Sequence, residues 1–176
     1  AFEQGINYFE TADSYRGSES EPTLGDAVRG KRDRVYLTSK TYTSPTDRRD
    51  TMMQALEGSL RRLRTDYVDV YFNHAVNDVE RLKNPEWHEF TTRARQQGKI
   101  RFVGMSGHAG RLIECLDHAL DTGGVDVILA AYNFGQDPAF YQKLTRSYDF
   151  IARQPDLPRV LQKAKAKGVG VVVMKT

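Results

Sequence analysis

The sequence predicts an α/β protein built as a (β/α)8 TIM barrel, present here as an incomplete barrel of about six parallel βα units. Six short apolar runs alternate with longer segments of helical periodicity, a pattern typical of parallel strands joined by helices. Three of these runs end in polar residues, and active sites of such barrels lie at the C-terminal ends of the strands. A complete barrel typically needs about 250 residues. Because this chain has 176, we expect it to lack the first strand and the last βα unit.

The order of the elements follows from the apolar pattern and its breaks. The first strand is expected over residues 6–11, and the others over residues 35–39, 68–72, 100–105, 125–131 and 169–174. Helices are expected over residues 21–28, 47–64, 85–98, 111–120, 138–153 and 159–167. Ser18 or Ser20 is the expected N-cap of the first helix and Asn84 that of the third, while prolines, Pro158 among them, separate the last two. A doubly wound open sheet is the competing arrangement, but the residues at the strand ends favour the barrel.

Length and composition set limits on the kind of protein. We expect residues 1–176 to form one domain, because 176 residues fall within the usual size of one. The net charge of +3 comes from interspersed charges of both signs, which indicates a solvated surface and no nucleic-acid partner. The single cysteine, Cys115, cannot form an intramolecular disulfide and lies on an apolar helix face. No apolar run approaches the roughly 20 residues of a membrane span, so we expect no membrane association and a cytoplasmic protein.

Four residues at the predicted strand ends carry groups that can do chemistry. Glu10 ends the first strand and Tyr15 follows five positions later. Lys40 comes directly after the second strand, and His74 follows the third. Each of these residues taken alone is more often an ordinary surface or core residue. Together, at the ends of three successive strands, they predict a catalytic cluster.

The segment around these residues resembles the aldo-keto reductase family, whose signature runs aromatic, Asp, Thr, Ala, two variable positions and Tyr. This chain has Phe9-Glu10-Thr11-Ala12-Asp13-Ser14-Tyr15 at that place. The resemblance continues in the family's order through residues 37–40, 59–69, His74 and 98–106, and so covers nearly the whole chain. It implies an NAD(P)H-dependent oxidoreductase that reduces small aldehydes or ketones to alcohols by hydride transfer, with NADP(H) as cofactor.

The resemblance also implies a role for each member of the cluster. Tyr15 is expected to be the general acid, and Lys40 to lower its pKa from about 10 by stabilising the phenolate. Glu10 keeps the ammonium charged, and His74 orients the carbonyl group. Glu10 departs from the family's usual aspartate by one methylene. We expect the Tyr15 hydroxyl and the Lys40 ammonium to lie within hydrogen-bond reach, about 2.6–3.2 Å.

Residues that bind the cofactor are likewise implied by the resemblance. Ser106 is retained where the family holds the nicotinamide amide, and Gly107 replaces the asparagine that usually follows. Met174 takes the place where many members stack a tyrosine on the nicotinamide ring. Asn133 and Lys175 complete the expected cofactor-binding set. No GxGxxG fingerprint is present, so barrel loops would have to hold the cofactor.

Two other readings of the sequence stay open, together with a question about metal. A barrel lysine near a tyrosine and a carboxylate can also form an imine, so Lys40 could serve a Schiff-base aldolase. The departures from the family at Glu10 and Gly107, and at Leu129 where many members carry a glutamine, also allow a non-catalytic barrel that acts as a binding or regulatory subunit. His108 could join His74 and Glu10 as a metal ligand, but the H-x-H and H-E-x-x-H spacings are absent, so no metal is expected.

Overall fold

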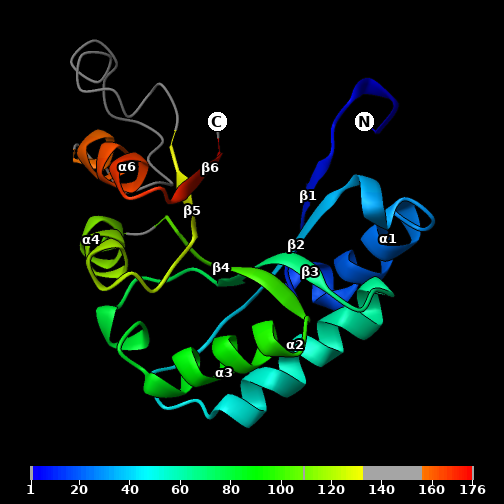
Figure 1. The fold of residues 1–176 in the computed structure, drawn as a ribbon, viewed down its shortest axis with the longest axis horizontal. Coiled ribbons are helices and arrows are strands. Elements are labelled where there is room, and N and C mark those ends of the chain that lie inside the picture. The colour runs from blue at the N-terminus through cyan, green and yellow to red at the C-terminus, as the bar shows by residue number, and fades with distance from the viewer. Residues whose placement is uncertain (1, 109, 133–155, 176) are drawn as a thin grey trace. The chain divides into compact units, whose positions relative to one another are not determined.

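The computed structural model describes residues 2–108, 110–132 and 156–175, and Figure 1 shows its strands and helices. The chain forms two compact units, residues 1–74 with 84–103 and residues 75–83 with 104–176. In the sheet the six strands are neighbours in chain order from β1 to β6. A doubly wound sheet would reverse its strand order at a switch point, so this order is that of a barrel sheet.

The first unit holds three parallel strands at its N-terminal side, β1 (Tyr8–Glu10), β2 (Tyr36–Thr41) and β3 (Val68–Asn73). Glu10 lies opposite Thr38 across β1 and β2, and Lys40 lies opposite Phe72 across β2 and β3. β1 spans only Tyr8–Glu10 and is thus shorter than the strand predicted over residues 6–11. Its continuation still runs beside β2, because the Thr11 N–H donates to the Thr38 carbonyl at 3.1 Å.

The helices of the first unit are α1 (Ser20–Ala27), α2 (Arg49–Leu63) and α3 (Pro85–Gln96). Short 3-10 turns occupy Phe2–Gln4 (η1), Tyr15–Ser18 (η2) and Arg32–Arg34 (η3). Asn84 caps α3 as predicted, since its side chain accepts the Glu86 N–H. The predicted serine cap of α1 is wrong: α1 has no side-chain cap, and the Ser20 hydroxyl instead accepts a hydrogen bond from Thr11 at 2.9 Å.

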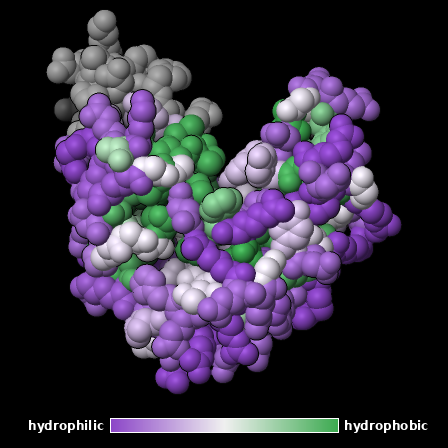
Figure 2. All heavy atoms as spheres, viewed as in Figure 1, coloured by the Kyte–Doolittle hydropathy of each residue, from purple (hydrophilic) through white to green (hydrophobic). Residues whose placement is uncertain are grey.

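One face of each helix packs on the sheet, and the other meets water. α2 and α3 lie side by side, and the surface over them is mostly hydrophilic (Figures 1 and 2). The buried core of this unit is made by these residues: Val28, Val35, Leu37, Met52, Leu56, Leu60, Leu63, Val68, Tyr71, Trp87, Phe90, Ala94, Ile100 and Val103. Glu21 of α1 is fully buried as well, and binds Ser39 at 2.5 Å and Arg62 at 2.7 Å. This carboxylate ties α1 to β2 and to α2.

The second unit contains the end of β4 (Ile100–Gly107), then β5 (Val127–Ala131) and β6 (Gly170–Met174), all parallel. Its helical elements are η4 (Val79–Arg81), α4 (Leu112–Thr122) and α6 (Leu157–Ala166). Pro158 was predicted to precede the helix over residues 159–167, but α6 begins at Leu157 and Pro158 lies in its first turn, where its missing N–H costs no helical hydrogen bond. The helix predicted over residues 138–153 lies outside the described residues.

Packing in the second unit joins α4 and α6 to the strands. Cys115 is one of its buried core residues, as its apolar helix face predicts. On the surface, Asp117 of α4 accepts hydrogen bonds from Arg159 and Lys163 of α6, at 2.6 and 2.7 Å. Among the described residues, no helix is both long and apolar enough to cross a membrane.

Candidate active site

Glu10 and Lys40 form an ion pair across the ends of β1 and β2. The Lys40 Nζ donates to the Glu10 Oε1 at 2.7 Å. The Lys40 side chain is only 1% exposed, whereas that of Glu10 is 26% exposed. Burial lowers the pKa of Lys40, and the neighbouring Glu10 charge opposes that shift. The longer glutamate therefore reaches the lysine, and the pair holds an ammonium in a site that water barely enters.

Tyr15 begins η2 and lies against this pair through its ring. The Lys40 Nζ is 4.9 Å from the centroid of the Tyr15 ring, within the range of a cation–π contact. Among the described residues no hydrogen bond joins the Tyr15 hydroxyl to Lys40, so the contact differs from the expected one. The pKa of Tyr15 is raised, not lowered as predicted, because burial and then the Glu10 charge disfavour the phenolate.

His74 follows β3 and completes the group. Its backbone N–H donates to the Thr41 carbonyl at 2.8 Å, which keeps the chain beside β2 past the end of β3. Its ring meets the Tyr15 ring edge to face, with centroids 5.5 Å apart and an interplanar angle of 75°. The structure thus brings Glu10, Tyr15, Lys40 and His74 together within the first unit.

The residues predicted to bind a cofactor belong to the second unit, and their surroundings differ. Ser106 is 1% exposed, and its hydroxyl accepts the Ala75 N–H at 3.0 Å. Gly107 is buried too, and a Cβ there would lie 2.9 Å from the Val76 carbonyl oxygen and 2.7 Å from the side chain of Leu112. Position 107 therefore has no room for a side chain. An asparagine there would not fit this backbone.

The end of β6 offers more accessible groups. The Met174 side chain is partly exposed and that of Lys175 is exposed, with a left-handed backbone (φ 61°) at Lys175. Burial lowers the pKa of His108, and the positive charge of Lys175 adds to the shift. Asn133 lies outside the described residues. Met174 and Lys175 are thus placed where a bound molecule could reach them.

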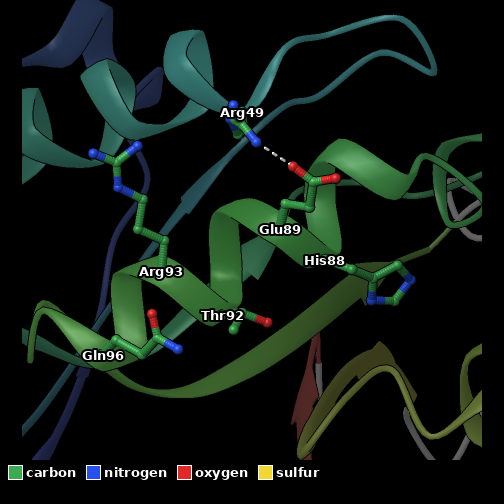
Figure 3. Close-up of a pocket in the computed structure, with 6 residues that line it drawn as sticks. All are labelled: Arg49, His88, Glu89, Thr92, Arg93 and Gln96. Atoms are coloured by element: carbon green, nitrogen blue, oxygen red, sulfur yellow. Dashed lines mark hydrogen bonds and ion pairs between the residues drawn. The ribbon is translucent and has the colours of Figure 1, made fainter.

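A separate depression of about 580 Å³ lies along α3 and is bordered by Arg49 of α2 (Figure 3). It is lined by Arg49, His88, Glu89, Thr92, Arg93 and Gln96. An ion pair between Arg49 and Glu89 crosses it from α2 to α3. Its lining side chains are exposed and polar, and they do not include Glu10, Tyr15, Lys40 or His74. In the described ranges, no three His, Cys, Asp or Glu side chains are grouped so as to hold a metal ion.

Comparison with known proteins agrees with this arrangement. The model of the aldo/keto reductase family matches residues 1–176. The chain belongs to the aldo-keto reductase family. The methylglyoxal reductase YeaE of Escherichia coli is 39% identical over 108 residues, which are 59% of this chain and 35% of that protein. The chain spans about half the length of the curated relatives it matches.

Solved structures of the family share the fold of this aldo-keto reductase. An aldo-keto reductase of Klebsiella pneumoniae in complex with NADPH is 27% identical, with a TM-score of 0.70 over 98% of this chain and 54% of that one. The holo form of an aldo-keto reductase of Bacillus halodurans is 26% identical, with a TM-score of 0.69 over 98% of this chain and 53% of that one. The predicted fold class, an incomplete (β/α)8 barrel, is confirmed.

One pair beside the cluster of Glu10, Tyr15, Lys40 and His74 was missed by sequence reasoning. Asp13 accepts a hydrogen bond from the Thr41 hydroxyl at 2.6 Å, a contact that the sequence pattern did not predict. Thr41 is the residue after Lys40, so its side chain points to the other face of β2. The sequence did contain one indication of this pair, because β2 ends with the polar residue Thr41 directly after Lys40. Its partner could be named only once the register of β1 and β2 was known.

Proposed function

We propose that this chain carries the catalytic group of an NADP(H)-dependent reductase, which converts aldehydes or ketones to alcohols by hydride transfer. The proposal rests on one observation: at the ends of the strands, the Glu10–Lys40 ion pair lies against the rings of Tyr15 and His74. The Glu10–Lys40 bond of 2.7 Å, the Lys40–Tyr15 contact of 4.9 Å and the Tyr15–His74 contact of 5.5 Å link the four side chains in series. Such a chain of groups suits the delivery of one proton to a carbonyl oxygen.

In this proposal Tyr15 is the general acid. When hydride reaches the carbonyl carbon, negative charge develops on the oxygen, and the phenol proton moves to it. The raised pKa of Tyr15 keeps the phenol protonated at neutral pH, so the proton is available. The Lys40 ammonium against the ring favours the phenolate that remains. His74 beside Tyr15 orients the substrate oxygen.

NADPH supplies the hydride when it is bound. The exposed side chains of Met174 and Lys175 fit a role in holding it, and Ser106 fits less well because its hydroxyl already accepts the Ala75 N–H. The choice of NADP(H) is supported by the Klebsiella pneumoniae relative, which was solved with NADPH. The choice of a small carbonyl substrate is supported by the relative named methylglyoxal reductase. A cytoplasmic location remains our expectation.

The test is stopped-flow NADPH oxidation with a reactive aldehyde, comparing wild type with Tyr15→Phe. Phenylalanine keeps the ring contacts but has no proton to give, so the single-turnover rate should fall about 10²–10⁴-fold. Tyr36→Phe is the matched control, because it removes the hydroxyl of a tyrosine on β2 that is 54% exposed and outside the cluster. Equal rates for Tyr15→Phe and wild type would refute the role of Tyr15.

The same assay separates the two alternatives. Absence of turnover by wild type, with NADPH still bound, would favour a non-catalytic binding or regulatory subunit. Borohydride trapping of a carbonyl compound on Lys40 would favour a Schiff-base aldolase. No observation on the described residues supports either alternative, and the ion pair with Glu10 opposes the loss of the Lys40 proton that imine formation needs.

A further inference from the structure

Among the described residues, the Tyr15 side chain interacts with Lys40 and His74 through its ring and not through its hydroxyl. It is 38% exposed, and in the part of the chain that the structure describes its hydroxyl makes no hydrogen bond. Its contacts with Lys40 and His74 are ring contacts, which tolerate sliding and tilting better than a hydrogen bond does. The position of the ring must therefore come largely from the backbone that carries it.

That backbone is fastened to the end of β2. The Asp13 N–H donates to the Lys40 carbonyl at 3.0 Å, and the Tyr15 N–H donates to the Ala12 carbonyl at 3.2 Å. The Thr41 hydroxyl then donates to the Asp13 Oδ2 at 2.6 Å. Thr41 is 4% exposed, so water competes little for this bond. One side-chain bond thus joins the residue two before Tyr15 to the residue one after Lys40.

The backbone conformation of residues 16–18 gives a second reason why the loop needs a hydrogen bond at Asp13. Arg16, Gly17 and Ser18 have left-handed backbones, with φ of 53°, 63° and 75°. Residues with a Cβ adopt this conformation at a cost, so this turn persists only if both of its ends are held. The Thr11–Ser20 bond of 2.9 Å closes the loop, and Asp13 is the point nearest the ring at which a side chain fastens it.

We propose that Thr41 and Asp13 are positioning residues, whose hydrogen bond sets where the Tyr15 ring lies against the Lys40 ammonium. This inference rests on the proposed function for its catalytic consequence, but the position of the ring can be measured without turnover. Neither residue needs to touch the substrate. Loss of the bond lets the loop relax, and a displacement of about 1 Å at a reacting group can cost about 10²-fold in rate.

Asp13 also carries a charge, and the experiment must separate charge from hydrogen bond. Burial lowers the pKa of Lys40, while the charges of Glu10 and then of Asp13 oppose that shift. Thr41→Val removes the donor and leaves the charge, whereas Asp13→Asn removes the charge and leaves an acceptor for Thr41. Thr41→Ser restores the hydroxyl. Thr91→Val is the matched control, since Thr91 is 6% exposed and its hydroxyl donates to a backbone carbonyl within α3.

Two readouts test the inference. In single-turnover NADPH oxidation, Thr41→Val should be about 10–100-fold slower than wild type, with unchanged NADPH affinity, while Thr41→Ser and Thr91→Val stay close to wild type. Asp13→Asn keeps an acceptor for Thr41, so its rate should lie closer to wild type than that of Thr41→Val, and an equal loss in both variants would overturn the inference. Ultraviolet difference titration against Tyr15→Phe follows the phenol itself. Its midpoint should fall toward the ordinary value of about 10 in Thr41→Val, because a released ring loses burial and moves away from Glu10.

The outcomes distinguish this inference from the proposed function. Lack of turnover in wild type would refute the function, and the Tyr15 titration would then decide the positioning role alone. A folded Thr41→Val variant with the wild-type titration midpoint and rate would overturn the inference. If Thr41→Val does not fold, Asp13→Ala tests the same bond from the loop side. Its titration midpoint should fall in the same way, and an unchanged midpoint would overturn the inference as well.

Discussion

Removing Glu10 should destabilise this protein more than removing its partner Lys40. The Lys40 side chain is 1% exposed and Glu10 accounts for its hydrogen bond, so Glu10→Gln removes the hydrogen-bonded counter-charge of a buried ammonium and leaves Asp13 as the negative charge that still acts on it. Lys40→Met leaves a carboxylate that is 26% exposed, which water can solvate, and fills the buried site with an apolar chain. The asymmetry follows from the unequal burial of the two charges.

The loss of unfolding free energy in Glu10→Gln has an upper limit, which is the free energy needed to remove the proton of Lys40. Removing one partner of a buried ion pair typically costs about 3–5 kcal/mol. Lys40 can avoid the cost by losing its proton, and from an ordinary pKa of 10.5 that escape costs about 5 kcal/mol at pH 7. The amide of glutamine still accepts a hydrogen bond, so we expect Glu10→Gln to lose about 2–4 kcal/mol of unfolding free energy. We expect Lys40→Met to lose about 1 kcal/mol or less.

The pH dependence supplies the decisive measurement. The folded-state pKa of Lys40 lies below its unfolded value, so between the two the unfolded chain binds more protons and stability rises with pH. Glu10→Gln lowers the folded-state pKa further. At pH 9.5 the cost of deprotonating Lys40 drops to about 1.4 kcal/mol. The loss of unfolding free energy in Glu10→Gln relative to wild type should therefore be smaller at pH 9.5 than at pH 7. Urea unfolding of both variants and wild type at pH 7 and pH 9.5 tests this, and equal losses at pH 7 or a deficit independent of pH would refute the reasoning.

Three further predictions concern stability. Gly107→Ala should lower the unfolding free energy by about 1–3 kcal/mol in urea titration, because its Cβ would meet the Val76 carbonyl oxygen at 2.9 Å; no loss would show that this backbone yields easily. Arg62→Met should cost about 2–3 kcal/mol by the same method, since it strands the buried Glu21, whereas a neutral result would mean that water reaches this carboxylate. Hydrogen bonding, chiefly with Arg159, lowers the pKa of Asp117 from 3.8 to about 2, so its stabilising effect is lost as pH falls through that window. Thermal melting of Asp117→Asn should be less sensitive to pH there than wild type, and parallel melting profiles would contradict the assignment.

The amino-acid sequence by itself determined the βα alternation and most of the elements. Apolar residues recur every second position in a strand and about every 3.6 positions in a helix, so the local pattern distinguished the two. The start of α3 could also be predicted locally, because the Asn84 side chain caps the helix only two residues away. The sequence also determined which polar residues end the strands. Because parallel strands deliver their C-terminal ends to one edge, Glu10, Lys40 and His74 could be expected together before any coordinates were known.

Only the tertiary structure decided how these groups meet. The contact of Lys40 with the ring of Tyr15, and the direction of the tyrosine pKa shift, depend on burial and on the path of the loop after β1. The bond between Thr41 and Asp13 joins residues 28 positions apart, and the crowding at Gly107 comes from segments that are distant in the chain. Local pattern cannot fix such features, because distances between segments and access of water arise only when the elements pack. The sequence therefore determined which groups reach the site, and packing decided their geometry and their acidity.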